Sequence, residues 1–159
     1  MGRKKVFSVK HTESVVDYVR SNPGSHLRAI QRGLGLPLTS VSRLLGELST
    51  SGTLIKDDSG FFSRYYPKKS PPPQERAFIA ALRNKRRQKI LGYLYKNPFV
   101  NHFTLGKGLR IPPSSLTYHM QKLEQAKVIE SRTRGNMKLY RLKSPTLYKR
   151  TSVAVIRAK

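Results

Sequence analysis

Apolar residues recur with a helical period in two stretches of the chain. In each stretch, apolar side chains follow one another at positions i, i+4 and i+7, which is typical of a helix with one buried face. The two stripes are Val41, Leu45 and Leu48, and Leu116, Met120 and Leu123. A proline opens each stretch, and a glycine-leucine pair ends a shorter apolar segment just before it. We therefore predict long helices over residues 37–51 and 112–126, each preceded by a short helix and a tight turn.

These stretches are parts of a longer internal repeat. Residues 15–54 align with residues 90–129 without an insertion or deletion, at a constant offset of 75 positions. A gap-free register over this length is hard to obtain by chance, so we interpret the chain as two copies of one fold. The identical pairs are Tyr18/Tyr93, Asn22/Asn97, Pro23/Pro98, Gly33/Gly108, Leu34/Leu109, Pro37/Pro112, Ser40/Ser115 and Leu48/Leu123.

After each long helix, the apolar period changes from helical to alternating. We predict one β-hairpin over residues 53–56 and 61–66, joined by a turn of aspartate, serine and glycine, and another over residues 128–132 and 137–142. Three helices followed by a two-stranded hairpin is the order of elements in a winged-helix domain. The predicted fold class is therefore mainly α with small β-hairpin wings (α+β), arranged as two tandem winged-helix domains.

The sequence predicts five consecutive parts. They are a basic N-terminal arm (1–11), winged-helix domain 1 (12–67), a proline-rich linker (68–73), winged-helix domain 2 with an extra N-terminal helix (74–143) and a C-terminal tail (144–159). The arm is either a flexible segment that meets phosphates or a solvated tail with one short strand pairing. We expect the first helix to start near Thr12, whose hydroxyl can cap it. The pattern predicts no shape for the tail.

The extra helix before the second domain carries apolar residues on more than one face. They are Phe78, Ile79, Ala81 and Leu82. Because a helix of this kind has apolar surface to bury on more than one side, we expect it to pack against the second domain or against a partner chain. The second alternative predicts a homodimer through the helix around Phe78–Leu82.

The charge of the chain is strongly positive. There are 32 lysines and arginines against 8 aspartates and glutamates, a formal net charge of +24. Up to Ser70 there are 12 basic and 5 acidic residues (+7), and the remainder has 20 and 3 (+17). Such an excess implies a polyanionic partner, and the second half carries most of it.

The predicted long helices carry polar side chains opposite their apolar stripes. Short hydrogen-bonding groups and a cation on the outer face of a helix suit the major groove of double-stranded DNA. The candidate DNA-binding residues are Thr39, Ser40, Ser42 and Arg43 in the first helix, and Ser114, Ser115, Thr117, Tyr118 and Lys122 in the second. Arg43 is suited either to a guanine edge or to a phosphate, and Tyr118 either to stacking or to partial packing.

Cations in the hairpins and in one basic run are candidate phosphate contacts. In the wings they are Lys56 and Arg64, then Arg132, Arg134, Lys138 and Arg141; the basic cluster is Arg83, Lys85, Arg86, Arg87 and Lys89. The first wing has Asp57 and Asp58 at its tip. We therefore expect the second domain to supply most of the affinity, with the first reading DNA weakly or contacting protein.

Several segments resemble a known family. Residues 23–30, 34–48 and 60–67, together with 115–129, are similar to archaeal winged helix-turn-helix proteins of the arsenic-repressor-like class. The resemblance covers roughly residues 12–67 and 74–143, and it implies double-stranded DNA binding, commonly in transcriptional regulation. Pro37 and Pro112 stand where the family often has serine or threonine, and the cysteines of its metal sensors are missing. Metal sensing is therefore not implied.

Other kinds of chemistry find little support. The chain has no cysteine, and His11, His26 and His102 are scattered without ligand spacing, so we expect no metal site and no cofactor. His119 aligns with Leu44, which indicates a half-buried structural position.

The carboxylates are dispersed and no nucleotide loop is complete, so we expect neither catalytic residues nor a small-molecule substrate. No apolar run is long enough for a bilayer, so we expect no membrane partner and a soluble protein of the cytoplasm, associated with the nucleoid.

Three functions remain open at this point. The first is a double-stranded DNA-binding transcriptional regulator, favoured by the two polar-faced helices. The second is an abundant nucleoid-associated protein that binds DNA with little sequence specificity, favoured by the net charge. The third is an RNA- or ribosome-associated accessory protein, since winged helices also serve that use.

Overall fold

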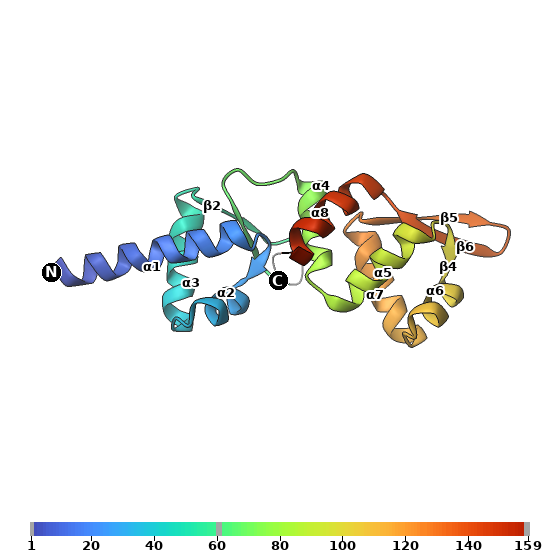
Figure 1. Ribbon diagram of the computed structural model, residues 1–159, viewed down its shortest axis with the longest axis horizontal. Coiled ribbons are helices and arrows are strands. Elements are labelled where there is room, and N and C mark those ends of the chain that lie inside the picture. Colours follow the sequence, from blue (N-terminus) through green and yellow to red (C-terminus); the bar gives the residue numbers. More distant parts are fainter. Residues whose placement is uncertain (1, 60–61, 158–159) are drawn as a thin grey trace. The chain divides into compact units, whose positions relative to one another are not determined.

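The computed structural model describes residues 2–59 and 62–157, with side chains described for residues 9–59 and 62–156. The chain divides between Ser70 and Pro71 into two compact units, which we call unit 1 and unit 2. The described residues form eight helices and two three-stranded antiparallel sheets (Figure 1). The predicted fold class, an α+β protein with two tandem winged-helix domains, is confirmed.

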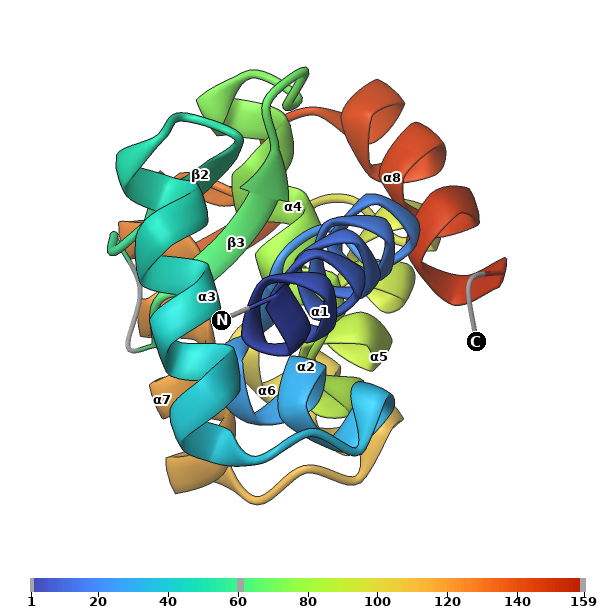
Figure 2. The ribbon, with the colours of Figure 1, turned by 90° about the vertical axis from the view of Figure 1, so that its left-hand side faces the viewer.

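Unit 1 has the winged-helix order of elements. They are α1 (Gly2–Ser21), β1 (Ser25–His26), α2 (Leu27–Leu34), α3 (Leu38–Thr50), β2 (Leu54–Asp57) and β3 (Arg64–Pro67). The strand order in the sheet is β1-β3-β2. Helix α1, seen nearly end-on in Figure 2, packs against α2, α3 and β3. The buried core is Val15, Val19, Ile30, Val41, Leu44, Leu45, Leu48, Leu54 and Tyr65.

The first helix begins earlier than the sequence predicts. Helix α1 starts at Gly2, so the expectation of a flexible arm or a short strand before a helix at Thr12 is wrong. No proline or further glycine interrupts residues 3–21, and each residue added to an existing helix gains a hydrogen bond at little cost. Ser14 donates its hydroxyl to the Lys10 carbonyl, as expected inside a helix. The side chains of residues 1–8 of the predicted basic arm lie outside those that the structure describes.

Unit 2 repeats this order and adds a helix at each end. Its elements are α4 (Pro73–Leu82), α5 (Lys85–Lys96), β4 (Val100–Asn101), α6 (His102–Leu109), α7 (Pro113–Gln125), β5 (Ile129–Arg134), β6 (Met137–Leu142) and α8 (Pro145–Arg157). The strand order is β4-β6-β5, equivalent to that of unit 1. Helices α5, α6 and α7 pack on this sheet. The region expected as a tail is therefore largely the regular helix α8.

Helix α4 is the extra helix expected before the second domain. The side chains of Phe78, Ile79, Ala81 and Leu82 are all at most 4% exposed. The helix packs against α5 and α8 of the same unit. Of the two expected partners, the second domain is therefore confirmed, and α8 supplies part of the packing surface. A homodimer through these four side chains would require them to leave their packing within the chain.

The two hairpins differ in length from the prediction. Strand β5 continues to Arg134, so only Gly135 and Asn136 remain in the turn, with Gly135 at φ 60°. This is a two-residue hairpin turn, in which glycine accommodates the positive φ. In unit 1, β3 begins only at Arg64, and Gly60 and Phe61 of the expected strand and turn lie outside the described residues.

A glycine-tyrosine contact fixes the same helix crossing in both units. A Cβ atom on Gly33 would lie 2.2 Å from Cε2 of Tyr18, and one on Gly108 would lie 2.8 Å from Cε2 of Tyr93. Both distances are shorter than any real carbon contact, so only glycine lets the short helix approach the ring this closely. Two of the identical pairs in the repeat are thereby explained by packing.

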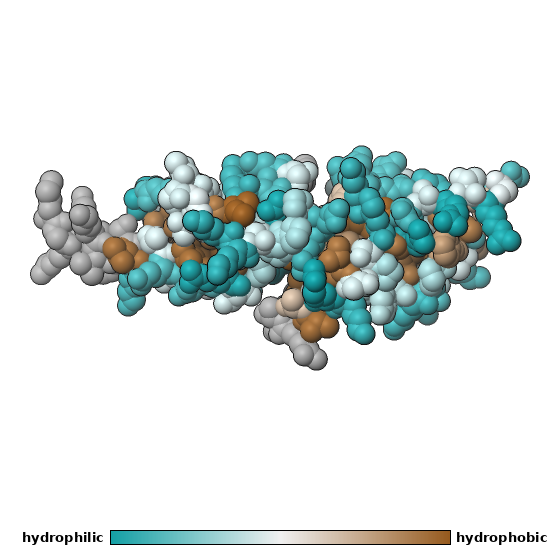
Figure 3. Space-filling view, turned by 90° about the horizontal axis from the view of Figure 1, so that it is seen from above, coloured by the Kyte–Doolittle hydropathy of each residue, from teal (hydrophilic) through white to brown (hydrophobic). Residues whose placement is uncertain are grey.

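The surface of the chain is largely hydrophilic on the face shown in Figure 3, where apolar residues appear only in separate areas. Among the described helices, none has the length and apolar content that a bilayer crossing requires.

Candidate nucleic-acid interface

Helix α7 presents the polar face that the sequence predicts. Ser114, Thr117 and Tyr118 are exposed, while Ser115 and Lys122 are half-buried. The apolar stripe of Leu116, Met120 and Leu123 is buried at 2% exposure or less. Pro112 precedes the first turn and Pro113 occupies it, where a missing N–H has no helical partner to lose. The helix therefore points its hydroxyl and aromatic side chains outward.

Gln121 belongs to the same exposed face and was not among the predicted residues. It is exposed, and it follows Thr117 by four positions and Tyr118 by three, so the three side chains are neighbours on the helix. A glutamine amide can donate to and accept from an adenine edge in the major groove. The i+3 and i+4 spacing from Tyr118 and Thr117 was the signal that could have identified Gln121. The sequence prediction missed it because it did not consider amide side chains.

The hydroxyl of Thr117 is fixed by two contacts. It donates to the Pro113 carbonyl at 2.9 Å and lies 3.1 Å from Nε2 of His102. His102 is the first residue of α6, so the contact ties the start of the short helix to the exposed face of α7. A side chain that is already oriented loses less conformational entropy when it binds.

The structure brings part of the basic cluster to the first turn of α7. Asn84 caps α5 by accepting hydrogen bonds from the backbone N–H groups of Arg86 and Arg87. Nη1 of Arg86 then donates to Oγ of Ser115 at 2.8 Å. Lys85 and Lys89 are exposed on the same helix, whereas Arg83 is half-buried at the end of α4. Arg86 therefore joins the basic cluster to the polar face of α7.

Arg87 and His119 lie below this surface. Arg87 is half-buried, and burial lowers the pKa of its guanidinium from the usual value. His119 is 7% exposed, more buried than predicted, and its Nδ1 has no hydrogen-bond partner among the described residues. Burial, followed by the charges of Arg87 and Arg86, lowers the pKa of His119. His119 is thus a buried residue of α7 that senses the charges of Arg87 and Arg86 on α5.

The cations of the second wing fall into two groups. Lys138 pairs with Glu124 of α7 at 3.2 Å, and its pKa is raised, chiefly by that hydrogen bond. Arg141 pairs with Glu130, to which its Nε donates at 2.6 Å. Arg132 and Arg134 are exposed and have no carboxylate partner among the described residues.

Helix α3 of unit 1 carries a similar hydroxyl face but a different charge pattern. Thr39, Ser42 and Arg43 are exposed, and Ser40 is half-buried. Nη1 of Arg43 lies 3.1 Å from Oε1 of Glu47, one turn further along the same helix. The predicted cation of this face is therefore partly neutralised by its neighbour.

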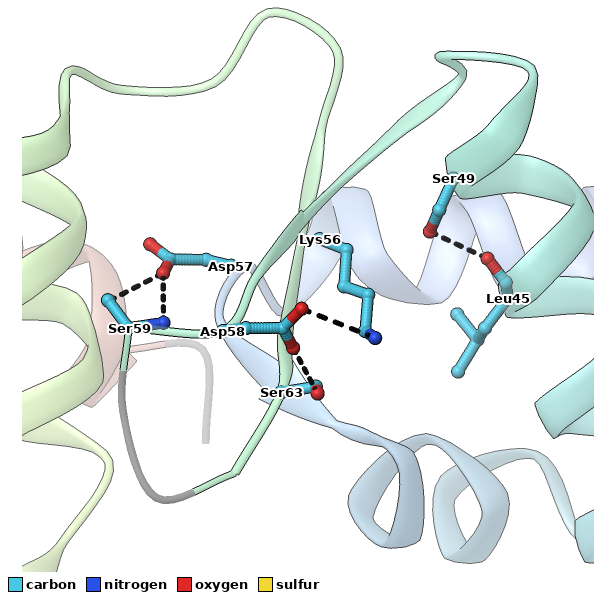
Figure 4. Close-up of polar contacts among 7 residues, drawn as sticks. All are labelled: Leu45, Ser49, Lys56, Asp57, Asp58, Ser59 and Ser63. Carbon is cyan, nitrogen blue, oxygen red and sulfur yellow. Dashed lines mark hydrogen bonds and ion pairs between the residues drawn. The ribbon is translucent and has the colours of Figure 1, made fainter.

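The first wing is compensated in the same way. Nζ of Lys56 lies 3.3 Å from Asp58, whose carboxylate also accepts a hydrogen bond from the Ser63 hydroxyl (Figure 4). The pKa of Asp58 is lowered chiefly by the hydrogen bond from Ser63; desolvation opposes this shift, and Lys56 lowers the pKa further. Asp57 accepts from both the backbone and the hydroxyl of Ser59.

Arg64 is placed differently from the predicted phosphate contact. It is half-buried, and its Nη1 donates to the Gly24 carbonyl at 2.7 Å. This hydrogen bond ties β3 to the loop before β1. The hydrogen bond thereby helps to hold the wing against the rest of unit 1. Among the described residues, no three His, Cys, Asp or Glu side chains gather as ligands for a metal ion.

Comparisons with protein families agree with this geometry. Residues 83–130, which include α5 to α7, match the family model of winged helix-turn-helix DNA-binding domains. Residues 8–58, which include most of unit 1, match the model of the IclR helix-turn-helix domain. Each unit thus has its own helix-turn-helix match.

The chain is also similar to individual proteins. It is 24% identical over 140 residues to a protein of Methanocaldococcus jannaschii named as an uncharacterized HTH-type transcriptional regulator. That alignment covers 88% of this chain but 35% of the relative, so the chain spans about a third of the relative's length.

Solved structures give partial overlaps. The transcriptional regulator HlyU from Vibrio vulnificus overlaps with 48% of this chain and 79% of its own, at 25% identity and a TM-score of 0.44. A possible ArsR-family regulator from Mycobacterium bovis overlaps with 54% and 78%, at 20% identity and a TM-score of 0.46. At TM-scores below 0.5, these overlaps say nothing about what the chain binds.

Proposed function

We propose that the chain is a double-stranded DNA-binding transcriptional regulator in which unit 2 makes the principal contact. The observation that carries the proposal is the exposed face of α7, which presents Thr117, Tyr118 and Gln121. Arg86 is hydrogen-bonded to Ser115 in the first turn of this helix, and Lys138 of the wing pairs with Glu124 near its end. The two helix-turn-helix family matches and the regulator-like name of the archaeal relative support it.

In this proposal, α7 enters the major groove and the cations around it contact the backbone. Arg86, Lys85 and Lys89 lie at or near the start of α5, beside the first turn of α7, where they can meet the phosphates that flank the groove. Arg134, next to the turn of the second hairpin, reaches the neighbouring backbone or minor groove. Gln121 reads a base edge, and a well-placed bidentate contact to a base contributes about 1–3 kcal/mol of discrimination.

Unit 1 has a weaker share in this mechanism. Its predicted cations Arg43 and Lys56 are each paired with a carboxylate, and a phosphate has to displace that carboxylate to bind. Arg64 is committed to the Gly24 carbonyl. We infer that unit 1 contributes through hydroxyl contacts or through protein contacts, as the charge of the sequence suggested.

The finer parts of the assignment are also proposals. We infer an arsenic-repressor-like regulator that acts on the nucleoid in the cytoplasm, and a homodimer assembled through α8. Val153 and Ile156 are 45% and 50% exposed on that helix, whereas the predicted contact residues of α4 are buried. Light scattering of the full chain tests the dimer: a dimeric mass that becomes monomeric in Val153→Glu supports it, and a monomeric wild type contradicts it.

The function is tested by selecting bound sequences from a random duplex pool. The selected duplex, a scrambled duplex and a structured RNA are then titrated at about 150 mM salt. A selected-to-scrambled affinity ratio above about a thousand supports a regulator, because specific sites are typically that much tighter than non-specific ones. A ratio near one favours the nucleoid-associated protein, which the net charge of +24 also fits. Preference for the RNA contradicts both.

A further inference from the structure

Phe99 has a backbone conformation that phenylalanine rarely adopts. Its φ is 62°, in the left-handed region, and the aligned residue in unit 1 is Gly24, with φ 79°. Glycine adopts this region freely, whereas a residue with a Cβ is strained there. Strained residues of this kind persist where the surrounding structure holds them, and they cluster at functional positions. Arg110 and Lys127 also have positive φ where unit 1 has glycine, and Phe99 differs from them in the contacts of its ring.

The ring lies under two arginines at the surface. It is 40% exposed, and its centre lies 5.4 Å from Cζ of Arg132 and 5.2 Å from Cζ of Arg141. Both distances fall within the range of cation–π contacts. The ring thus holds two positive groups close to each other, although like charges repel.

This cluster is on the face of the sheet that points away from α7. Glu130 pairs with Arg141 in the register of β5 and β6, and the next residue of β6 toward the turn, Tyr140, is 7% exposed. Since successive residues of a strand point to opposite faces, Tyr140 faces the helices and Arg141 faces outward. A ligand bound at Arg141 therefore does not compete with the exposed face of α7.

A cavity opens beside the two arginines. It has a volume of about 260 Å³ and is lined by Glu130, Ser131, Arg132 and Arg141. Arg141 is compensated by Glu130, whereas Arg132 has no carboxylate partner in the part of the chain that the structure describes. The lining side chains thus carry two positive charges and one negative charge, which favours an anion.

The repeat shows that the winged-helix scaffold does not require this cluster. At the register positions of Phe99, Arg132 and Arg141, unit 1 has Gly24, Asp57 and Tyr66. All three residues differ between the units, and together they convert an unstrained and partly acidic set into a strained and basic one. The two arginines and the exposed ring are therefore features of unit 2 and not of the shared scaffold.

We propose that Phe99, Arg132 and Arg141 form a binding site for a phosphate group. The Arg132 guanidinium donates two parallel hydrogen bonds to the phosphate oxygens, the geometry that arginine and phosphate share. Nη1 of Arg141, which is not used by Glu130, adds a third donor. Phe99 is a positioning residue that holds both guanidiniums at the cavity. The proposal goes beyond DNA binding by α7 and does not depend on it.

The test is a titration of the full chain with inorganic phosphate, followed by NMR of the arginine Nε–H groups. We expect the Arg132 and Arg141 signals to shift saturably, with a Kd near 1 mM, while sodium chloride of equal ionic strength does not reproduce the shift. Phe99→Gly should weaken the binding about tenfold because it removes the cation–π support without changing any charge. Arg132→Asp, which introduces the unit 1 residue, should abolish it.

A matched control and a stability measurement make the test decisive. Phe103→Ala removes another exposed ring of unit 2, at 75% exposure, and should leave phosphate binding unchanged. Phe99→Gly should keep or raise the thermal midpoint, because glycine relieves the strain; a ring that served only packing would lower it. Equal phosphate affinity in wild type and Phe99→Gly, or a response no different from chloride, would overturn the proposal.

Two sources of the phosphate are separated by two further arms. Adenosine monophosphate that binds at least tenfold more tightly than inorganic phosphate indicates a free nucleotide. Capture of a second labelled duplex by protein already bound to an immobilised duplex, with loss of capture in Phe99→Gly, indicates a DNA segment. Both outcomes support the site. If variants of α7 failed to change DNA binding, the proposed function would be contradicted, but the phosphate titration of Arg132 and Arg141 would still test the site.

Discussion

Units 1 and 2 have the same scaffold and different surface chemistry. Both order their strands in the same way, and both bring a glycine of the short helix against a tyrosine of the preceding long helix. Their exposed residues have diverged. Aligned pairs that differ in charge or hydrogen-bonding capacity are Gly46/Gln121, Glu47/Lys122 and Asp57/Arg132.

The difference shows which residues a duplicated fold can change. Buried apolar side chains and the glycine-tyrosine contact determine the scaffold, and a change there costs stability in either copy. Exposed positions carry a smaller penalty of this kind, and the two units differ there: within the described residues, unit 2 has exposed cations without a carboxylate partner at Arg132 and Arg134, whereas Arg43 and Lys56 of unit 1 are paired with carboxylates. We expect the two units to respond alike to changes in the scaffold and differently to changes in surface charge.

The largest expected effect comes from reversing cations of unit 2. Arg86→Glu combined with Arg134→Glu should reduce duplex affinity about 100-fold or more at ~150 mM salt, because each replaces a phosphate contact with a repulsive charge. The slope of log affinity against log salt should also fall by about two, roughly 0.9 for each lost contact. Fluorescence anisotropy with a labelled duplex measures both.

The matched variant in unit 1 carries the same change of charge. Arg43→Glu combined with Lys56→Glu reverses two cations that are already paired with Glu47 and Asp58. We expect a loss of less than about fivefold, since compensated cations have few counterions to release. Equal losses in the two double variants would refute the asymmetry between the units.

A scaffold change should affect both units. Gly33→Ala and Gly108→Ala each place a Cβ within 3.0 Å of a tyrosine ring, at 2.2 Å and 2.8 Å. Overpacking of this kind costs about 1–3 kcal/mol, and we expect the larger cost at Gly33, where the overlap is greater. Hydrogen exchange resolved by residue measures the stability of each unit separately. A neutral effect at either position contradicts a shared packing constraint.

Much of this architecture could be predicted from side-chain patterns. The apolar stripes located α3 and α7 to within one residue at each end, and the repeat predicted two winged-helix units. The predicted start of the first helix was wrong because a threonine such as Thr12 is compatible both with the cap of a helix and with its interior. Only the backbone of the folded chain shows that α1 passes through Thr12. A stripe identifies the buried face of a helix but not how far the helix continues.

The candidate site was predictable only in part. Exposed hydroxyls on α7 follow from periodicity, but the hydrogen bond of Arg86 to Ser115 joins residues 29 positions apart. Arg64 likewise finds the Gly24 carbonyl 40 positions away, where the sequence suggested a phosphate contact. Such pairings depend on the direction of side chains across different elements. Sequence spacing within one element does not contain that information.

A gain of affinity should follow when unit 1 receives a residue of unit 2. Glu47→Lys introduces the cation found at Lys122 and releases Arg43 from its ion pair. We expect duplex affinity to rise about five- to tenfold, with a steeper salt dependence, because up to two cations become available to phosphates. The control is Glu13→Lys, an equal charge change at an exposed site of α1. A similar gain in both variants would indicate general charge rather than the α3 face.

The smallest expected effect distinguishes the buried cores of the two units by pH. His119 is buried beside Arg86 and Arg87, whereas the aligned residue of unit 1 is Leu44. Because the folded pKa of His119 lies below its unfolded value of 6.5, the unfolded chain binds more protons around that pH. The stability of unit 2 is therefore greatest above about pH 6.5 and should fall as the pH drops through this value toward the folded pKa.

His119→Leu, which introduces the unit 1 residue, should flatten that dependence. Residue-resolved hydrogen exchange between about pH 5 and pH 7.5 compares the two units in one sample, and carboxylate pairs contribute mainly below that window. If unit 2 kept its pH slope in His119→Leu, another group would be responsible, and the buried histidine would not distinguish the two cores.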